Sequence, residues 1–264
     1  MRIIDFHTHA FPDSLAEQTV PKLCAFANVE ATLDGKISSL VGEMDRLGIE
    51  AAVVLTIATK ASQFESILNW CTDIASARLH PFASVHPEDP GALDKIDRVL
   101  AAGLKGIKLH PYYQEFRFND PRMFPLYERI ERNGLIFLAH TGFDMGYPRE
   151  RIADAPKIME VVERFPKLKL VTSHIGGWQD WDCVEKHLLG KPVHMEISYA
   201  LPFIGMERAR RFLRAHPPEY ILFGSDSPWG SQEKTLEALM SLDLGKELTR
   251  RICFDNAARL IGLD

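Results

Sequence analysis

The chain has 264 residues, and its 31 Lys and Arg against 36 Asp and Glu give a formal net charge of −5. Because it has no excess of basic residues to neutralise a phosphate backbone, we expect no nucleic-acid partner. Hydrophobic residues make up 46% of the chain. That content excludes a disordered or fibrous protein and suffices for a substantial core.

The N-terminal sequence MRIIDFHTHAF places Asp5, His7 and His9 where a signal peptide needs an apolar stretch. The longest apolar stretch, residues 51–58, is far shorter than the roughly 18 residues that a membrane helix needs. The four cysteines are scattered and form no CxxC pair, which favours reduced thiols. We therefore expect a cytoplasmic protein that makes no membrane contact.

Short runs rich in Val, Ile, Leu or Phe alternate along the chain with amphipathic stretches, as strands buried on both faces alternate with helices. The predicted strands are 2–9, 49–58, 79–87, 104–111, 135–142, 168–177, 193–200 and 220–229. The clearest helical stretches between them are 92–102 and 156–165, and 246–263 forms a helical tail.

This alternation, without a linker or a break in composition, predicts a single α/β domain over residues 1–264. About 33 residues for each strand and helix favour a closed (β/α)8 TIM barrel over an open doubly wound sheet. No glycine-rich phosphate-binding motif is present to support a nucleotide-binding fold. Segment 11–48 is too long for one loop and one helix, so we expect an insertion after the first strand that covers the barrel mouth like a lid.

Polar residues gather at the ends of the predicted strands, which is where barrel enzymes place their chemistry. Strand alternation predicts that Ile3, Asp5, His7 and His9 share one face of the first strand. The same rule groups Ile136, Leu138 and His140 on the fifth strand, Leu170, Thr172 and His174 on the sixth, and Leu222, Gly224 and Asp226 on the eighth. Lys108, His140 and His174 are spaced by 32 and 34 residues, so they should lie at similar heights on successive strands.

A divalent metal is the chemistry that this pattern favours over a pair of core histidines. His7 and His9, two residues apart on a strand, point the same way and can share an ion. His140 and Asp226 would complete a mixed nitrogen and oxygen set with an open position for water. Zinc is the default metal for these ligands, with manganese, iron and cobalt as alternatives. We expect one such site, and the ligand set leaves room for a second.

The chain resembles the amidohydrolase superfamily of (β/α)8 metal enzymes, and most closely the small amidohydrolases related to aminocarboxymuconate semialdehyde decarboxylase. The motifs that carry the resemblance are HTH at His7 and His9, AHTG at His140, SHIGG at His174 and GSDSPW at Asp226. The resemblance implies that His7, His9, His140 and Asp226 bind the first metal. It implies that His174 binds a second metal or acts on the substrate.

Lys108, in the motif GIKLHP of the fourth strand, has two interpretations. Family members with two metals often bridge them at this strand with a carboxylated lysine. The alternative is an ordinary ammonium that meets a substrate anion or a nearby carboxylate such as Glu196. His110, two residues further on, is either a substrate-binding residue or a hydrogen-bond partner of a loop.

We predict that Asp226 is the general base and that His174, or a second metal, polarises the bond under attack. The expected reaction is hydrolysis of a C–N, C–O or lactone bond in a small organic substrate. The alternative is metal-dependent, non-oxidative decarboxylation of a small unsaturated or aromatic acid, whose carboxylate Arg149 would help to bind. Trp229 is expected to line the substrate pocket. The family resemblance also suggests that the protein forms a homodimer.

Overall fold

The computed structural model describes residues 1–263. All eight predicted strands are present, each shorter than the sequence pattern predicts because the polar strand ends belong to loops. The strands are β1 (Ile4–Thr8), β2 (Ala51–Leu55), β3 (Leu79–Phe82), β4 (Gly106–Leu109), β5 (Ile136–Ala139), β6 (Lys169–Thr172), β7 (His194–Glu196) and β8 (Ile221–Leu222).

Neighbouring strands pair in parallel and in chain order, β1 to β3 in one sheet and β4 to β8 in another. The two sheets meet at both junctions. A parallel bridge joins Ala83, just after β3, to Ile107 of β4, and another joins Thr8 of β1 to Ser227, beyond β8. These bridges complete the ring of eight strands expected of the predicted α/β barrel.

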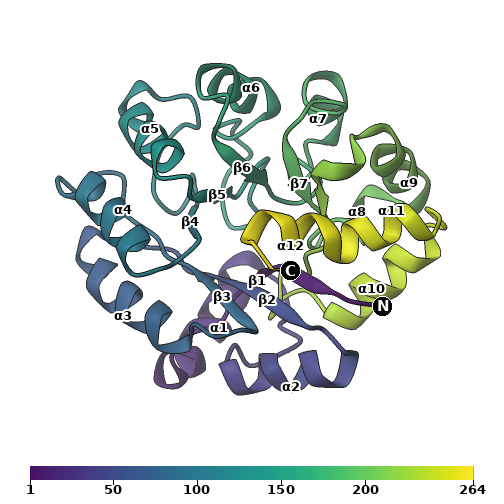
Figure 1. Ribbon diagram of the computed structural model, residues 1–264, viewed down its shortest axis with the longest axis horizontal. Coiled ribbons are helices and arrows are strands. Elements are labelled where there is room, and N and C mark those ends of the chain that lie inside the picture. The colour runs from purple at the N-terminus through teal and green to yellow at the C-terminus, as the bar shows by residue number, and fades with distance from the viewer. Residues whose placement is uncertain (264) are drawn as a thin grey trace.

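Helices surround the strands, as Figure 1 shows. They are α1 (Asp13–Ala27), α2 (Ile37–Leu47), α3 (Phe64–Ile74), α4 (Ala92–Ala101), α5 (Phe124–Arg132), α6 (Ala155–Arg164), α7 (Trp181–His187), α8 (Leu201–Ile204), α9 (Met206–Ala215), α10 (Gln232–Ser241), α11 (Lys246–Arg250) and α12 (Asn256–Ile261). None of the helices in the described part of the chain is long and apolar enough to span a bilayer.

The predicted insertion after the first strand contains two helices. Helix α2 ends at Gly48, whose φ of 67° suits glycine, and leads directly to β2. Helix α1 is therefore the added element, and it ends at Asn28, another residue in the left-handed region. The predicted helical tail is also present, with a π-helical turn (Arg251–Asp255) between α11 and α12.

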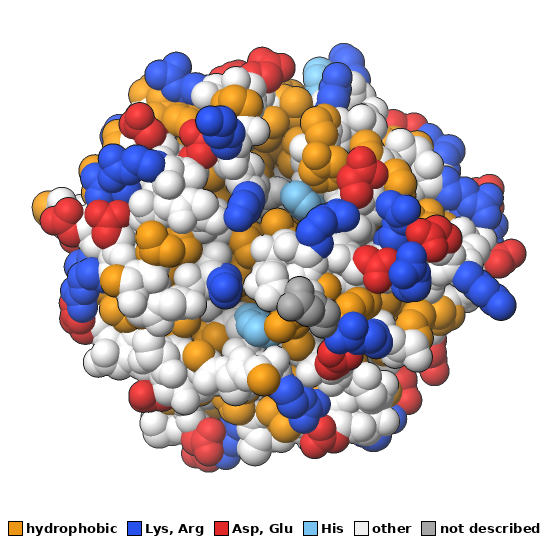
Figure 2. Space-filling model, viewed as in Figure 1, with side chains coloured by type: hydrophobic (Ala, Val, Ile, Leu, Met, Phe, Trp, Pro, Cys, Tyr) orange, Lys and Arg blue, Asp and Glu red, His pale blue; other side chains and the backbone are white. Residues whose placement is uncertain are grey.

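The core has two parts, one between the strands and the surrounding helices and a smaller one inside the strand ring. Inside the ring, Ile4 and Phe6 of β1 pack with Ile136, Leu138 and Leu222, and α12 closes this end of the barrel. In Figure 1, α12 crosses in front of the strands at this end. Positive and negative side chains are interspersed over the same face in Figure 2.

The predicted alternation of β1 is wrong, because the strand pairing shifts register between Asp5 and Thr8. Asp5 faces outward, where its carboxylate accepts hydrogen bonds from Ser225 Oγ at 2.6 Å and Gln232 Nε2 of α10 at 2.8 Å. His7 lies on the opposite side and reaches Glu196 of β7. A β-bulge of this kind re-aims the side chains that follow it.

The buried His216 is hydrogen-bonded in its neutral form. Its Nε2 donates to the carbonyl oxygen of Val193 at 2.9 Å, while its Nδ1 accepts from the backbone N–H of Gly190 at 3.3 Å. A proton on Nδ1 would face that N–H. Burial lowers the pKa of His216 to about 4, and the bond to Val193 raises it only in part.

We expect His216 to make the fold acid-sensitive. The folded chain binds fewer protons than the unfolded chain between pH 6.5 and about 4. Stability is therefore full above this window and falls within it, by about 2–3 kcal/mol from this residue. Chemical denaturation at several pH values should show that His216→Asn is less stable than wild type at neutral pH but loses less on acidification. Parallel pH curves for the two proteins would contradict this account.

Candidate metal centre

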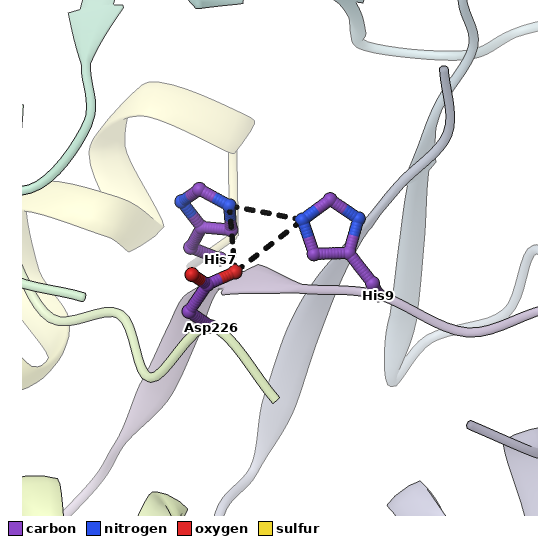
Figure 3. A group of neighbouring side chains, drawn as sticks. All are labelled: His7, His9 and Asp226. Atoms are coloured by element: carbon purple, nitrogen blue, oxygen red, sulfur yellow. Dashed lines mark hydrogen bonds and ion pairs between the residues drawn. The ribbon is translucent and has the colours of Figure 1, made fainter. Parts of the chain in front are cut away.

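Three side chains at and just beyond the carboxyl ends of β1 and β8 meet at the opposite end of the barrel from α12. His7 Nε2 lies 3.1 Å from His9 Nε2, and Oδ1 of Asp226 lies 3.3 Å from the first and 3.4 Å from the second. Figure 3 shows these three atoms facing one another. Both histidines and the aspartate were predicted as ligands from the sequence.

Hydrogen bonds on the far side of each ring determine which nitrogen faces the centre. His7 Nδ1 donates to Glu196 Oε1 at 2.8 Å, and His9 Nδ1 donates to the carbonyl oxygen of Leu55 at 3.0 Å. Each Nε2 is then an unprotonated acceptor. Two such lone pairs and a carboxylate oxygen repel one another at these distances, so the donor set fits a shared cation.

The electrostatics keep these groups in the states that metal binding requires. Burial lowers the pKa of His7 well below its ordinary value, and the Lys108 ammonium lowers it further, so His7 is neutral. Burial by itself raises the pKa of Asp226, but the nearby rings of His7, His9 and His174 bring the net pKa below its ordinary value. Asp226 is therefore ionised at neutral pH.

His140 and His174 form a second pair of facing nitrogens. His174 Nδ1 donates to the carbonyl oxygen of Ser198 at 2.9 Å, and His140 Nε2 donates to that of Phe143 at 2.8 Å. The remaining atoms, His174 Nε2 and His140 Nδ1, lie 3.2 Å apart. The structure thus places His140 beside His174, outside the compact group of ligand atoms formed by His7, His9 and Asp226.

Strand alternation does not predict the position of His174. Leu170 packs in the outer core and Val171 in the inner core, so continued alternation would turn His174 outward. Instead His174 and Ile175 have positive φ values of 58° and 56°, so the extended strand conformation has ended and its alternation does not apply to His174. This conformation is uncommon for non-glycine residues, above all for a β-branched one such as Ile175. The predicted faces of β5 and β8 agree with the structure, because Ile136, Leu138 and Leu222 line the inner core.

Glu196 binds the site histidines rather than Lys108. Its carboxylate accepts hydrogen bonds from His7, from Oγ of Ser198 at 2.9 Å and from the backbone N–H of His174 at 3.1 Å. Among residues 1–263, no ion pair joins Lys108 to a carboxylate. Lys108 is 1% exposed, and burial lowers its pKa to about 8 although Asp226 and Glu196 oppose the shift.

Sequence reasoning missed Asp144, which lies five residues beyond β5. Its Oδ2 is 3.4 Å from His110 Nε2 and 3.8 Å from His140 Nε2, which makes a second group of three with ligand geometry. Burial lowers the pKa of His110 to about 4, and the bond to Asp144 raises it only in part. Asp144 lies in the loop after Gly142 and Phe143 and not in a strand, so strand periodicity gave no reason to expect it at the site.

A cavity of about 430 Å³ opens above these groups. His110 and Trp229 line it, as predicted, and the Trp229 ring lies 5.3 Å from that of His9. Arg149, which was predicted to bind the substrate, does not line this cavity. Its guanidinium stacks on the Phe143 ring at 4.0 Å and donates a hydrogen bond to Gln179 at 2.6 Å. Arg149 lines a separate surface pocket instead, because its loop turns away from the barrel mouth.

Residues 4–263 match the amidohydrolase family, and the chain belongs to that family. A dihydroorotase from Azoarcus sp. (strain BH72) is 31% identical over 111 residues, which are 38% of this chain and 32% of that protein. The match therefore spans about a third of the length of that curated relative. The family membership confirms the resemblance found in the sequence, and members of this superfamily are generally metal-dependent enzymes.

Solved structures with the same fold cover nearly the whole chain. An uncharacterized TIM-barrel protein from Bordetella bronchiseptica has a TM-score of 0.77 at 19% identity, covering 100% of this chain and 99% of that one. The 5-carboxyvanillate decarboxylase of Sphingomonas paucimobilis has a TM-score of 0.74 at 14% identity, covering 100% and 99%. A probable 2-pyrone-4,6-dicarboxylic acid hydrolase from Acinetobacter baumannii has a TM-score of 0.72 at 16% identity, covering 99% and 100%. At these identities the likeness confirms the TIM-barrel fold.

The loops that hold His140 and His174 are joined at Gly142, and we expect Gly142→Ala to separate them. Gly142 bridges to Trp178 with a φ of 85°, and an added Cβ would lie 2.1 Å from the Trp178 nitrogen. The matched control is Gly103→Ala, where φ is 78° but no atom lies within 4 Å. The control should cost about 1 kcal/mol, and Gly142→Ala about 2 kcal/mol more, in denaturant unfolding. Equal losses would mean that this contact does not constrain the loops.

Proposed function

We propose that the protein is a metal-dependent hydrolase that cleaves a C–N, C–O or lactone bond of a small organic molecule with an activated water. The observation that supports this most is the position of Asp226. Its carboxylate borders the two Nε2 atoms and is 16% exposed, compared with 2% for His7 and 9% for His9. Of the three groups it is the one that a water in the cavity meets most readily.

His7, His9 and Asp226 would hold the first divalent ion, most simply zinc, with manganese, iron or cobalt as alternatives. A bound divalent ion polarises a carbonyl and makes water more acidic. The ionised Asp226 accepts the proton of the attacking water and returns it to the leaving nitrogen or oxygen. Glu196 and the carbonyl of Leu55 keep both histidine rings in the required tautomer throughout.

A second ion is proposed at His140 Nδ1 and His174 Nε2, where two acceptors face each other as at the first site. This assigns His140 to the second ion rather than the first. Lys108 is electrostatically coupled to both sites, since it lowers the pKa of His7 and of His140. Burial lowers the pKa of Lys108 to about 8, which favours its neutral amine. The Nζ atom of that amine would form a bond to the carbon of carbon dioxide and release one proton, and the resulting carbamate would help to hold the two ions.

Decarboxylation is a second candidate because of the same lysine. Lys108 is the one Lys or Arg among the described residues that line the cavity, and as an ammonium it would bind a substrate carboxylate beside the ion. The fold is shared by a decarboxylase and a probable hydrolase, so it is compatible with either reaction.

Metal content tests the centre. Elemental analysis of protein purified without chelators should give at least one divalent ion per chain. His9→Ala should lower it strongly, while His187→Ala, on α7 outside the centre, should leave it unchanged. Two ions in wild type and one or none in Lys108→Ala would support the bridge, and one ion in both proteins would remove it. No metal in wild type, even after reconstitution, would refute the proposal.

The reaction is tested by measuring kcat of wild type and Asp226→Asn with an ester, lactone or amide that the wild-type protein hydrolyses. Loss of the general base should lower kcat about 10²- to 10⁴-fold. Turnover in H₂¹⁸O should place one labelled oxygen in the product of wild type. Carbon dioxide release without label uptake would instead identify a decarboxylase.

A further inference from the structure

The cavity has a polar floor and an apolar wall, and helix α1 supplies one side of the wall. Leu15, Thr19, Leu23 and Ala27 all line the cavity. They are spaced by four residues, so they form one stripe along the helix. The stripe continues the cavity away from the histidines toward the solvent.

Helix α3 and the end of β2 supply the facing side. Ile67 and Trp70, three residues apart on α3, line the same cavity, as does Ile57 beyond β2. Leu15 is 49% exposed, and neither Leu15 nor Leu23 belongs to or packs against the core clusters of the described chain. Their apolar surface therefore stays available to an occupant of the cavity, which would gain about 25 cal/mol for each Å² removed from water.

The charges of the lining restrict that occupant. Lys108 lies at the floor, and the carboxylates Asp144 and Asp226 are the ionised acids among the described lining residues. No Arg of residues 1–263 lines this cavity; Arg149, Arg151 and Arg208 line a separate pocket. An anionic group held against the apolar stripe, below the solvent-exposed mouth, would lose water without gaining a cationic partner, which costs up to several kcal/mol.

From this arrangement we infer the class of substrate, an inference that rests on the proposed function. The substrate is an amide, ester or lactone with a single reactive polar head and one apolar body, aliphatic or aromatic. The head lies at the histidine floor and the body lies between α1 and α3. Dicarboxylates, whose second charge would lie against the stripe of α1, are excluded.

A homologous series of alkyl hydroxamic acids tests this, because the hydroxamate head binds divalent metal and the tail length varies. Isothermal titration calorimetry would follow acetohydroxamic through octanohydroxamic acid on the zinc-loaded and the metal-free protein. Each methylene should lower Kd about three- to fourfold until the channel is filled. The matched probe is the eight-carbon hydroxamic acid that ends in a carboxylate, which should bind at least about tenfold more weakly than octanohydroxamic acid.

Two variants locate the tail. Leu23→Asn should remove most of the gain for octanohydroxamic acid and leave acetohydroxamic acid unchanged. Thr19→Phe should shorten the channel, so that only the longer tails lose affinity. The control is Leu100→Asn on α4, where a leucine that is 45% exposed lies outside the cavity. It should change neither affinity.

The outcomes separate the two proposals. Equal Kd values along the series, equal binding of the carboxylate-ended probe, or no effect of Leu23→Asn would overturn the substrate class. A length dependence that is the same with and without zinc, with no added affinity from the metal, would retain the channel and overturn the metal-dependent function. Failure of octanohydroxamic acid to bind either form would overturn both.

Discussion

The hydrogen bonds of Glu196 are the constraint on which the site depends. This fully buried carboxylate holds Nδ1 of His7, the hydroxyl of Ser198 and the backbone of His174, so one side chain from β7 orients groups from β1 and β6. Without it, His7 could present either nitrogen to the centre. A buried carboxylate that determines the tautomer of a metal-facing histidine also makes that ring a better donor.

The strained backbone at the strand ends is a second requirement. His174 and Asp226 both have positive φ values, at 58° and 68°, and β1 shifts register just before His7. Each departure turns a side chain toward the centre that a regular strand would place elsewhere or at another angle. Such conformations persist only when the surroundings stabilise them, here by Glu196 and by the bridge from Gly142 to Trp178.

The polar floor and the apolar wall have different structural origins. The floor is made by strand ends, whose positions follow from the barrel itself. The wall depends on α1, an addition to the barrel that contacts the rim through Phe26, whose ring lies 5.4 Å from that of Tyr147. The candidate metal ligands are thus positioned by the barrel itself, whereas part of the apolar cavity wall is supplied by a helix added to it.

The sequence by itself predicted the eight strands, the insertion after the first, and the grouping of His7, His9 and Asp226 as candidate metal ligands, because hydrophobic periodicity and strand-end motifs are local properties. Only the tertiary structure decided that His140 pairs with His174, that Glu196 serves His7 rather than Lys108, and that Asp144 belongs to the site while Arg149 does not. Each of these depends on a bulge, a left-handed residue or a loop path. Such features arise from packing between distant segments, and strand alternation cannot encode them.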